Sequence, residues 1–256
     1  KRGGGDGIVK GTEAMIAGPL TTLSHTTKDI TYVLAGCHSL VQVGEGVMGD
    51  PIEMSSLKAV GWTFNPSSNQ AVPTDKSVNG KEGECSIHVL QRYHFSSRLQ
   101  RMSVLATVTE KGNSRTMVLA KGSPEKILTL LKSQPPHYAE AYRAMAERGM
   151  RVLALATRPY DGGMAKGKGP AREEVEKDLE FIGFVAFSCK VRRDTGEVIK
   201  GLVESSHFVA MATGDAALTA LFVAREVGIT TSDSSKTLIL QCVDDGPLEW
   251  VTTDKY

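Results

Sequence analysis

Apolar runs and helical periods alternate over the last third of the chain. The continuous apolar run GFVAFSC (183–189) is typical of a strand covered on both faces. The segments after it predict, in order, a helix over 195–206, a short buried strand ending in a turn over 207–215, a helix over 216–229 closed by Gly228, and a strand over 237–240. Strand, helix, strand, helix is the order of a parallel α/β unit.

The middle of the chain has a different pattern, in which polar turns separate longer apolar segments. RMSVLATVTE (101–110) and SRTMVLAK (114–121) surround a short Gly-Asn turn, which predicts an antiparallel hairpin. The segments after it predict, in order, a helix from Glu125, a second helix within 137–150, a strand over 151–158 and a mobile, glycine- and lysine-rich surface loop over 161–169.

These two patterns predict a mixed α/β (α+β) fold class with two parts. We expect residues 20–182 to form an antiparallel sheet flanked by helices and residues 183–256 to form an incomplete parallel α/β unit, which residues 1–19 join. A hydrophobic content of 41% in 256 residues is enough for sizeable cores.

Charge and cysteine content narrow the function classes. The net charge of +1, from 30 basic and 29 acidic residues, gives no support to nucleic-acid binding. Cys37, Cys85, Cys189 and Cys242 lie far apart without a CxxC pair, which is typical of reduced thiols rather than a disulfide framework or a metal site. No apolar run reaches the roughly 18 residues of a membrane span, and no signal peptide is apparent.

Two common nucleotide-binding motifs give no support to a nucleotide site here. The P-loop pattern G-x-x-x-x-G-K-[ST] does not occur. GEGVMG (44–49) matches G-x-G-x-x-G, but it follows the helix-like CHSLVQV (37–43) rather than a strand, so we interpret it as a turn.

Three other segments suit a nucleotide, each with a simpler alternative. In ATGDAALTA (212–220), Thr213 and Asp215 lie where a strand leads into a helix, and this position suits a phosphate or a plain helix cap. In YHFSSRLQRMSV (93–104), Phe95 either stacks on a purine or belongs to the core. In MVLAKGSPEKILTLL (117–131), Lys121 ends an apolar strand at a sharp turn, and it either serves a buried site or provides solubility.

The order of five motifs, however, resembles the cytosolic nucleotide-binding (N) and phosphorylation (P) domains of P-type ATPases, in which KGAPE and MITGDN occur in the same sequence. The resemblance covers nearly the whole chain. The motifs are GDPIE (49–53), FSSRLQRMSV (95–104), KGSPE (121–125), GMRVLALA (149–156) and MATGDAALTALFVARE (211–226).

Details of these motifs are most similar to the type V subfamily. CHSL, GDPIE followed by Trp62, and FSSRLQRMSV carry this similarity. GFVAFSC before the turn KVRRD, SSHFVAMATGD, and LILQ followed by EW (249–250) favour its A branch, the endoplasmic-reticulum members described as dislocases of transmembrane helices. The B branch, which exports polyamines, is the near alternative. The resemblance implies that 1–19 begin the P domain, 20–182 are the N domain, and 183–256 continue a haloacid-dehalogenase-like P domain.

The resemblance also implies roles for individual residues. Lys121, beside Gly122, lies deep in the nucleotide pocket, Phe95 stacks on adenine, and Glu53 orients the base. The remaining implied residues are Met102 against the ring, Arg98 (where the family arginine position holds Ser97), Arg151 at the ribose and phosphate, and Thr213, Gly214, Asp215 and Arg192 on the side of the terminal phosphate.

The implied cofactors are ATP and Mg²⁺. The implied partners are the transmembrane, actuator and remaining P-domain parts of one membrane polypeptide, with this chain on the cytosolic face of the endoplasmic reticulum. The phosphorylated aspartate of DKTGT and the GDGxND segment do not occur here, so we expect no catalytic residue, no metal ligand and no turnover in this chain.

Ala212 and Ala216 replace Ile and Asn of MITGDN, and they support one alternative, an interaction domain that has lost nucleotide binding. The missing catalytic acid argues against a stand-alone phosphatase.

Overall fold

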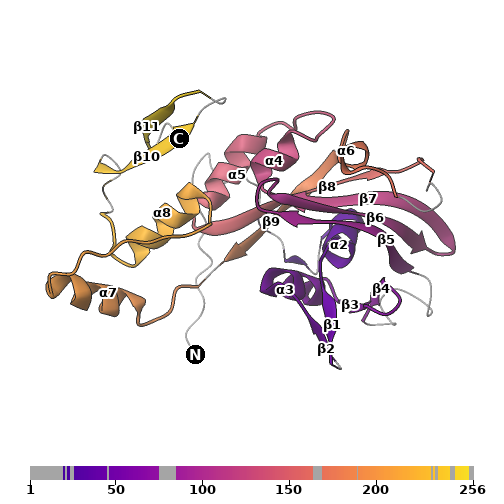
Figure 1. Ribbon diagram of the computed structural model, residues 1–256, viewed down its shortest axis with the longest axis horizontal. Helices are drawn as coiled ribbons and strands as arrows, with labels where there is room; N and C mark the ends of the chain where they lie inside the picture. The colour runs from indigo at the N-terminus through magenta and orange to yellow at the C-terminus, as the bar shows by residue number, and fades with distance from the viewer. Residues whose placement is uncertain are drawn as a thin grey trace. The chain divides into compact units, whose positions relative to one another are not determined.

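The computed structural model describes residues 20, 22–23, 26–44, 46–74, 85–163, 169–188, 190–231, 233, 236–242 and 246–253 (Figure 1). The expected first P-domain segment (1–19), residues 164–168 of the expected mobile loop, and Cys189 lie outside this part. The chain divides into two compact units, Lys1–Tyr142 with Val152–Val185 and Arg143–Arg151 with Ala186–Tyr256.

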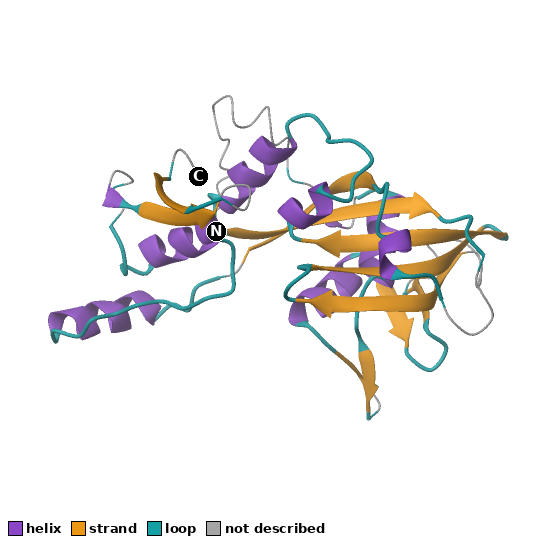
Figure 2. Ribbon diagram, turned by 45° about the horizontal axis from the view of Figure 1, so that its top comes forward, coloured by secondary structure: helices purple, strands orange, loops and turns teal. Residues whose placement is uncertain are grey.

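The first unit is built on a sheet of seven strands in the order β3-β4-β5-β6-β7-β8-β9 (Figure 2). Neighbours from β3 to β8 pair antiparallel, as expected for this part of the chain. The strands are β3 (Trp62–Asn65), β4 (Gln70–Pro73), β5 (Cys85–Ser96), β6 (Arg101–Glu110), β7 (Asn113–Gly122), β8 (Met150–Pro159) and β9 (Glu180–Ser188).

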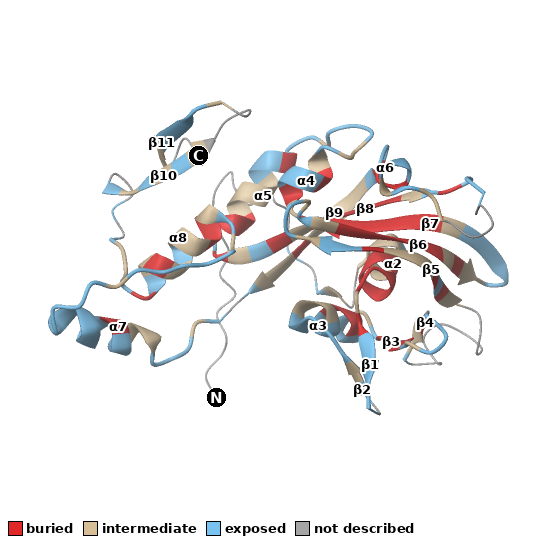
Figure 3. Cartoon of the chain, viewed as in Figure 1, coloured by how far each residue is buried: buried red, intermediate tan, exposed pale blue. Residues whose placement is uncertain are grey.

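Helices cover both faces of this sheet. On one face, Gly36 of α2 (Lys28–Gly36) approaches Leu119 and Ile87 so closely that a Cβ there would lie 2.9 Å and 3.0 Å from their side chains. On the other face, Leu105 and Val118 form a core with residues of α4 (Pro124–Leu128), α5 (Tyr138–Ala146) and α6 (Arg172–Val175). Helix α3 (Pro51–Ala59) packs against α2 and β3. The buried strands and α2 stand out in Figure 3.

The β6–β7 hairpin is confirmed, and its turn follows from two residues. Lys111 and Gly112 have φ angles of 49° and 80°, and this left-handed pair closes a two-residue loop between Glu110 and Asn113. Positive φ at both positions is the geometry of a type I′ turn, which matches the twist of antiparallel strands.

The segment GEGVMG (44–49) begins with a turn residue, Gly44, but Gly46–Met48 form a strand, so the interpretation as a turn is only partly right. The helix expected before this segment is wrong. Val41–Val43 is strand β1, which pairs with β2 (Gly46–Met48) through Gly44 at φ 61°. Alternating valines around a polar residue fit a strand better than a helix, and the nearby glycine supplies the reversal.

The second unit contains α7 (Thr195–Glu204) and α8 (Ala217–Glu226), both of which were expected. Gly228 has a φ angle of 81° and donates to the carbonyl of Arg225, while Ile229 donates to Ala224. These two bonds form a Schellman motif, so the predicted glycine closure of α8 is confirmed.

Strand pairing in the second unit differs from the expected parallel order. Residues 207–215 form no strand, and Phe208 is 97% exposed, since no described strand pairs with this segment. The strand expected over 237–240 exists as β10 (Leu238–Cys242), but it pairs antiparallel with β11 (Leu248–Thr252). The connection 243–247 is too short for the crossover that parallel strands need.

The remaining strand and thiol expectations have mixed outcomes. Residues 183–188 of GFVAFSC do lie in strand β9, but most of that strand is only half-buried because it is the last in the sheet order. Cys37 and Cys85 are free thiols, as expected, and burial raises the pKa of the Cys37 thiol to about 12. No helix in the described part of the chain is both long and apolar enough to cross a membrane.

A neutral histidine is buried next to α2. His38 has no exposed surface, and its ring meets Phe64 edge-on with 4.4 Å between the ring centroids. The guanidinium of Arg92 lies 5.3 Å from the same Phe64 ring, and its Nε donates to the carbonyl of His38 at 3.1 Å. Burial, and then the cations of Lys121 and Arg92, lower the pKa of His38 from 6.5 to about 3.

Acid should therefore destabilise this fold through His38. The unfolded chain takes up a proton near pH 6.5 and the folded chain only near pH 3, so the contribution of neutral His38 is complete above pH 6.5 and is lost as the pH falls toward 3. At pH 5 the loss amounts to about 2 kcal/mol. Denaturant unfolding at pH 7 and pH 5 should give a larger stability loss for the wild type than for His38→Gln.

The exposed His88 provides the matched control for that experiment. His88→Gln should keep the wild-type pH dependence. An equal pH dependence in His38→Gln and the wild type would contradict the assignment to His38.

Candidate functional site

An ion pair of low exposure joins the end of β7 to the start of α3. Lys121 Nζ lies 2.8 Å from Glu53 Oε1, and the two side chains are only 10% and 11% exposed. The other oxygen of Glu53 accepts the backbone N–H of Ser39 at 3.0 Å. The ammonium therefore has a fixed position with little surrounding water, where its interaction with a ligand is stronger than on an open surface.

Local sequence explains why both partners are placed there. Asp50 accepts the N–H of Ile52 at 2.7 Å and Pro51 occupies the first turn, so GDPIE begins α3 and puts Glu53 into that turn. Ser123 precedes Pro124 as the N-cap of α4 and ends the strand just after Lys121. The alternative that Lys121 is a solubilising surface lysine is therefore wrong.

Met102 and Gly122 line the same strand ends but are closed to solvent. Met102 is the register partner of Lys121, and only 2% of its surface is exposed. Gly122 pairs with Arg101, where a Cβ would lie 2.6 Å from the Arg101 Cβ and 2.7 Å from the carbonyl of Gln100. Only glycine fits at this position without displacing backbone, so the glycine of KGSPE has a packing reason.

Phe95 lies near the end of β5, and Arg98 lies in the turn between β5 and β6. Phe95 is 60% exposed, whereas Tyr93, two residues earlier, is buried. The register of β5 against β6 shifts between Tyr93 and Ser96, and such a bulge redirects the side chains that follow. The alternative that Phe95 belongs to the core is therefore wrong; Arg98 is also exposed.

The second unit brings together Arg151 and the Thr213–Asp215 turn. Arg151 Nε donates to Asp215 Oδ1 at 2.9 Å, and the Thr213 hydroxyl donates to Asp215 Oδ2 at 3.2 Å. Asp215 is no helix cap, since the N-cap of α8 is Ala216 and has no side-chain bond. Gly214 lies between them, with open space where a Cβ would be.

Arg192 is engaged elsewhere. Its guanidinium donates to Asp194 at 2.6 Å, and both side chains are largely exposed. Within the described residues no contact joins Arg192 to the Thr213–Asp215 turn. The same residues contain no cluster of three or more His, Cys, Asp or Glu side chains placed to hold a metal ion.

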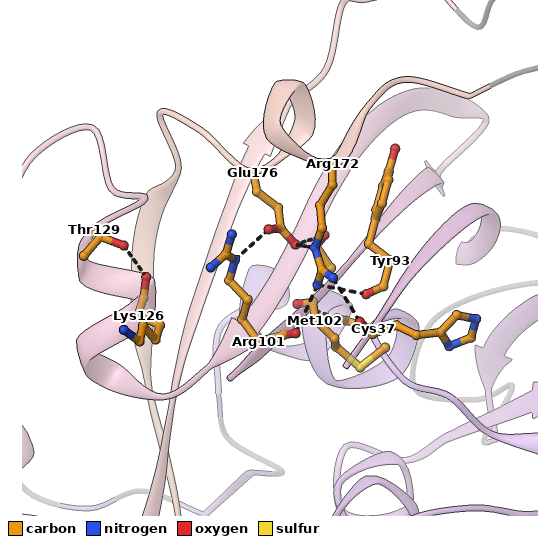
Figure 4. A network of polar contacts seen from close by, with 10 residues as sticks. Cys37, Tyr93, Arg101, Met102, Lys126, Thr129, Arg172 and Glu176 are labelled. Carbon is orange, nitrogen blue, oxygen red and sulfur yellow. Dashed lines mark hydrogen bonds and ion pairs between the residues drawn. The ribbon is translucent and has the colours of Figure 1, made fainter. Parts of the chain in front are cut away.

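The sequence did not reveal a buried charge cluster next to the end of β5 (Figure 4). Glu176 is 3% exposed and accepts from three donors: Arg101 Nε at 2.6 Å, Ser103 Oγ at 2.7 Å and Arg172 Nε at 2.8 Å. The i,i+4 spacing of Arg172 and Glu176 is a local sequence signal that could have indicated their pairing. Arg101 and Glu176 are 75 positions apart, so no local signal indicates that pairing.

The chain is similar to a known protein family and to several known proteins. Residues 35–194 match the family model of the P-type ATPase cytoplasmic domain N. The chain is 40% identical over 85% of its length to endoplasmic reticulum transmembrane helix translocase spfA of Aspergillus fumigatus, covering 17% of that protein. It is 39% identical over 87% to probable manganese-transporting ATPase PDR2 of Arabidopsis thaliana, covering 18%.

A third relative is the endoplasmic reticulum transmembrane helix translocase of Saccharomyces cerevisiae. It is 38% identical over 81% of the chain, and the match covers 16% of that relative. The chain thus spans less than a fifth of the length of these relatives. The matched family model covers more than half of the chain, from α2 to the segment before α7. The family expected from the motifs is confirmed, and the chain belongs to the P-type ATPases, with residues 35–194 forming their cytoplasmic domain N.

Proposed function

We propose that the first unit binds ATP, with Lys121 and Glu53 at the base of the site and Phe95 as the stacking surface for adenine. The observation that carries the proposal is the Lys121–Glu53 ion pair, held at the strand end with little solvent around it. Strands β5, β6 and β7 are consecutive neighbours, so the strand ends bearing Phe95 and Lys121 are about two strand spacings apart, roughly 10 Å. This separation suits one nucleoside.

Each group has a distinct task in this site. Glu53 neutralises Lys121 and fixes its position, while the other ammonium N–H groups of Lys121 remain for the ligand. An adenine ring on Phe95 gains about 1–3 kcal/mol from stacking. The exposed guanidinium of Arg98, three residues after Phe95, is a further contact for the nucleotide.

The second unit is proposed to serve the terminal phosphate. The Arg151–Asp215 pair and Thr213 form one hydrogen-bonded group, with Gly214 leaving room for close approach of a ligand to the backbone. Arg192 is included on its motif position alone. In these terms, 20–182 are the N domain and 183–256 are part of the P domain.

For the whole protein we propose a type V, A-branch ATPase of the endoplasmic reticulum membrane. The similarity to two proteins named transmembrane helix translocases supports this assignment. ATP with Mg²⁺ would phosphorylate an aspartate of the full-length enzyme, and this chain, on the cytosolic side, would supply the nucleotide site. No DKTGT occurs in the sequence, so the chain should bind ATP and release no phosphate.

Replacing Phe95 tests the stacking surface. Phe95→Ala should weaken ATP binding by about 5- to 150-fold, the equivalent of about 1–3 kcal/mol of lost stacking, without lowering the unfolding temperature. Isothermal titration with ATP gives the affinities. Phe208→Ala, in the second unit and 97% exposed, is the matched control and should bind as the wild type does. Equal affinities for Phe95→Ala and Phe208→Ala would reject the stacking role.

The ion pair needs a paired substitution. Lys121→Met alone leaves the buried carboxylate of Glu53 without its cation and should cost about 3 kcal/mol or more of stability. The double variant Lys121→Met with Glu53→Gln removes both charges and should regain most of that stability while binding ATP at least about tenfold more weakly. Urea unfolding and ATP titration report the two effects.

Glu110→Gln serves as the control, because Glu110 ends β6 about 27 Å from Met102. It should bind ATP normally. A stable double variant with wild-type affinity would show that the pair is structural only, and absence of saturable binding in the wild type would favour the interaction-domain alternative.

A further inference from the structure

The most unusual buried group outside the proposed ATP contacts is the carboxylate of Glu176 between two arginines. Arg101 and Arg172 both donate to it, so the cluster carries one more positive than negative charge in a nearly dry place. The Glu176 side chain is 1% exposed, and those of Arg101 and Arg172 are 17% and 18% exposed. Such a cluster is costly to bury and needs good geometry to be retained.

Arg172 also binds the backbone on either side of the turn between β5 and β6, close to Phe95 at the end of β5. Its NH1 donates to the carbonyl of His94 at 3.2 Å, and its NH2 lies 3.4 Å from the carbonyl of Tyr93 and 3.1 Å from that of Arg101. One guanidinium thus joins residues near the end of β5 to the first residue of β6. The bonds of this cluster are drawn in Figure 4.

These carbonyls lie where the sheet ladder is interrupted. Tyr93 pairs with Ser103 and Ser96 pairs with Arg101, so His94 and Phe95 have no partner in β6. A bulge leaves backbone groups unpaired, and such groups need another donor when water is excluded. Arg172 supplies that donor for His94, directly before Phe95.

We propose that Arg172, anchored by Glu176, is a positioning residue that holds the bulged end of β5 so that Phe95 is presented to the adenine ring. This inference rests on the proposed ATP site.

The cluster acts through the backbone and not by touching the nucleotide. Side chains alternate along β6, so Arg101 and Ser103 lie on the opposite face of the sheet from Met102, the register partner of Lys121. Glu176 therefore lies across the sheet from the Lys121–Glu53 pair. Lysine cannot replace Arg172 here, because a single ammonium lacks the planar fork that reaches Glu176 and several carbonyls together.

A double-mutant cycle on the 256-residue chain tests the role, with ATP affinity measured by isothermal titration. Arg172→Lys should weaken ATP binding about 3- to 10-fold when Phe95 is present and less than about 2-fold in the Phe95→Ala background. Affinity for inorganic tripolyphosphate, which has no base to stack, should be unchanged. A role confined to stability would not produce this dependence on Phe95.

Arg158→Lys is the matched control. Arg158 also bonds to the backbone of α6, through the carbonyls of Glu174 and Val175, but within the described residues none of its hydrogen bonds reaches β5. It should leave ATP affinity within about 2-fold of the wild type in both backgrounds. Should Arg172→Lys fail to show a cooperative thermal transition, Glu176→Gln takes its place in the same cycle with the same expectation.

Two results would overturn this inference but leave the proposed function intact, provided that the wild type binds ATP and Phe95→Ala weakens that binding. One is an equal loss of ATP affinity from Arg172→Lys in both backgrounds. The other is no loss of affinity from Arg172→Lys when Phe95 is present. A wild type that does not bind ATP would overturn the proposed function and, with it, this inference.

Discussion

Burying charge at the ends of the sheet strands is the constraint on which the site of the first unit depends. Lys121 keeps its ammonium with little water around it because Glu53 stands at 2.8 Å, and Glu53 in turn is held by the N–H of Ser39. Either ion alone, with so little exposure to water, would strongly destabilise the fold. The pair therefore ties α3 to β7 and fixes where a ligand would meet a cation.

A second buried group secures the same end of the sheet from its other face. Glu176 and the two arginines tie α6 to β6 and, through backbone carbonyls, to the end of β5. The end of β5 that carries Phe95 consequently lies between two fixed regions, although the phenyl ring itself is 60% exposed. A rigid backbone with an exposed aromatic ring is an arrangement that lowers the ordering cost of binding.

Local signals made parts of both units predictable from the sequence. The hairpin turn at Gly112 in the first unit and the closure of α8 at Gly228 in the second unit each depend on a few adjacent residues. The family resemblance assigned Lys121 and Glu53 to one nucleotide pocket, but it did not imply that they form an ion pair. The Arg101–Glu176 pair joins residues far apart in the sequence, so no local pattern indicates it. The second unit was harder because the length of a connection, rather than apolar content, decides whether β10 finds a parallel or an antiparallel neighbour.

ATP binding at this end of the sheet is tested most directly by mapping backbone amide chemical shifts while the chain is titrated with ATP. We expect saturable changes concentrated at Ser39, Glu53, Phe95 and Lys121. Saturable changes confined to other parts of the chain, or no changes at millimolar ATP in a folded protein, would contradict this expectation.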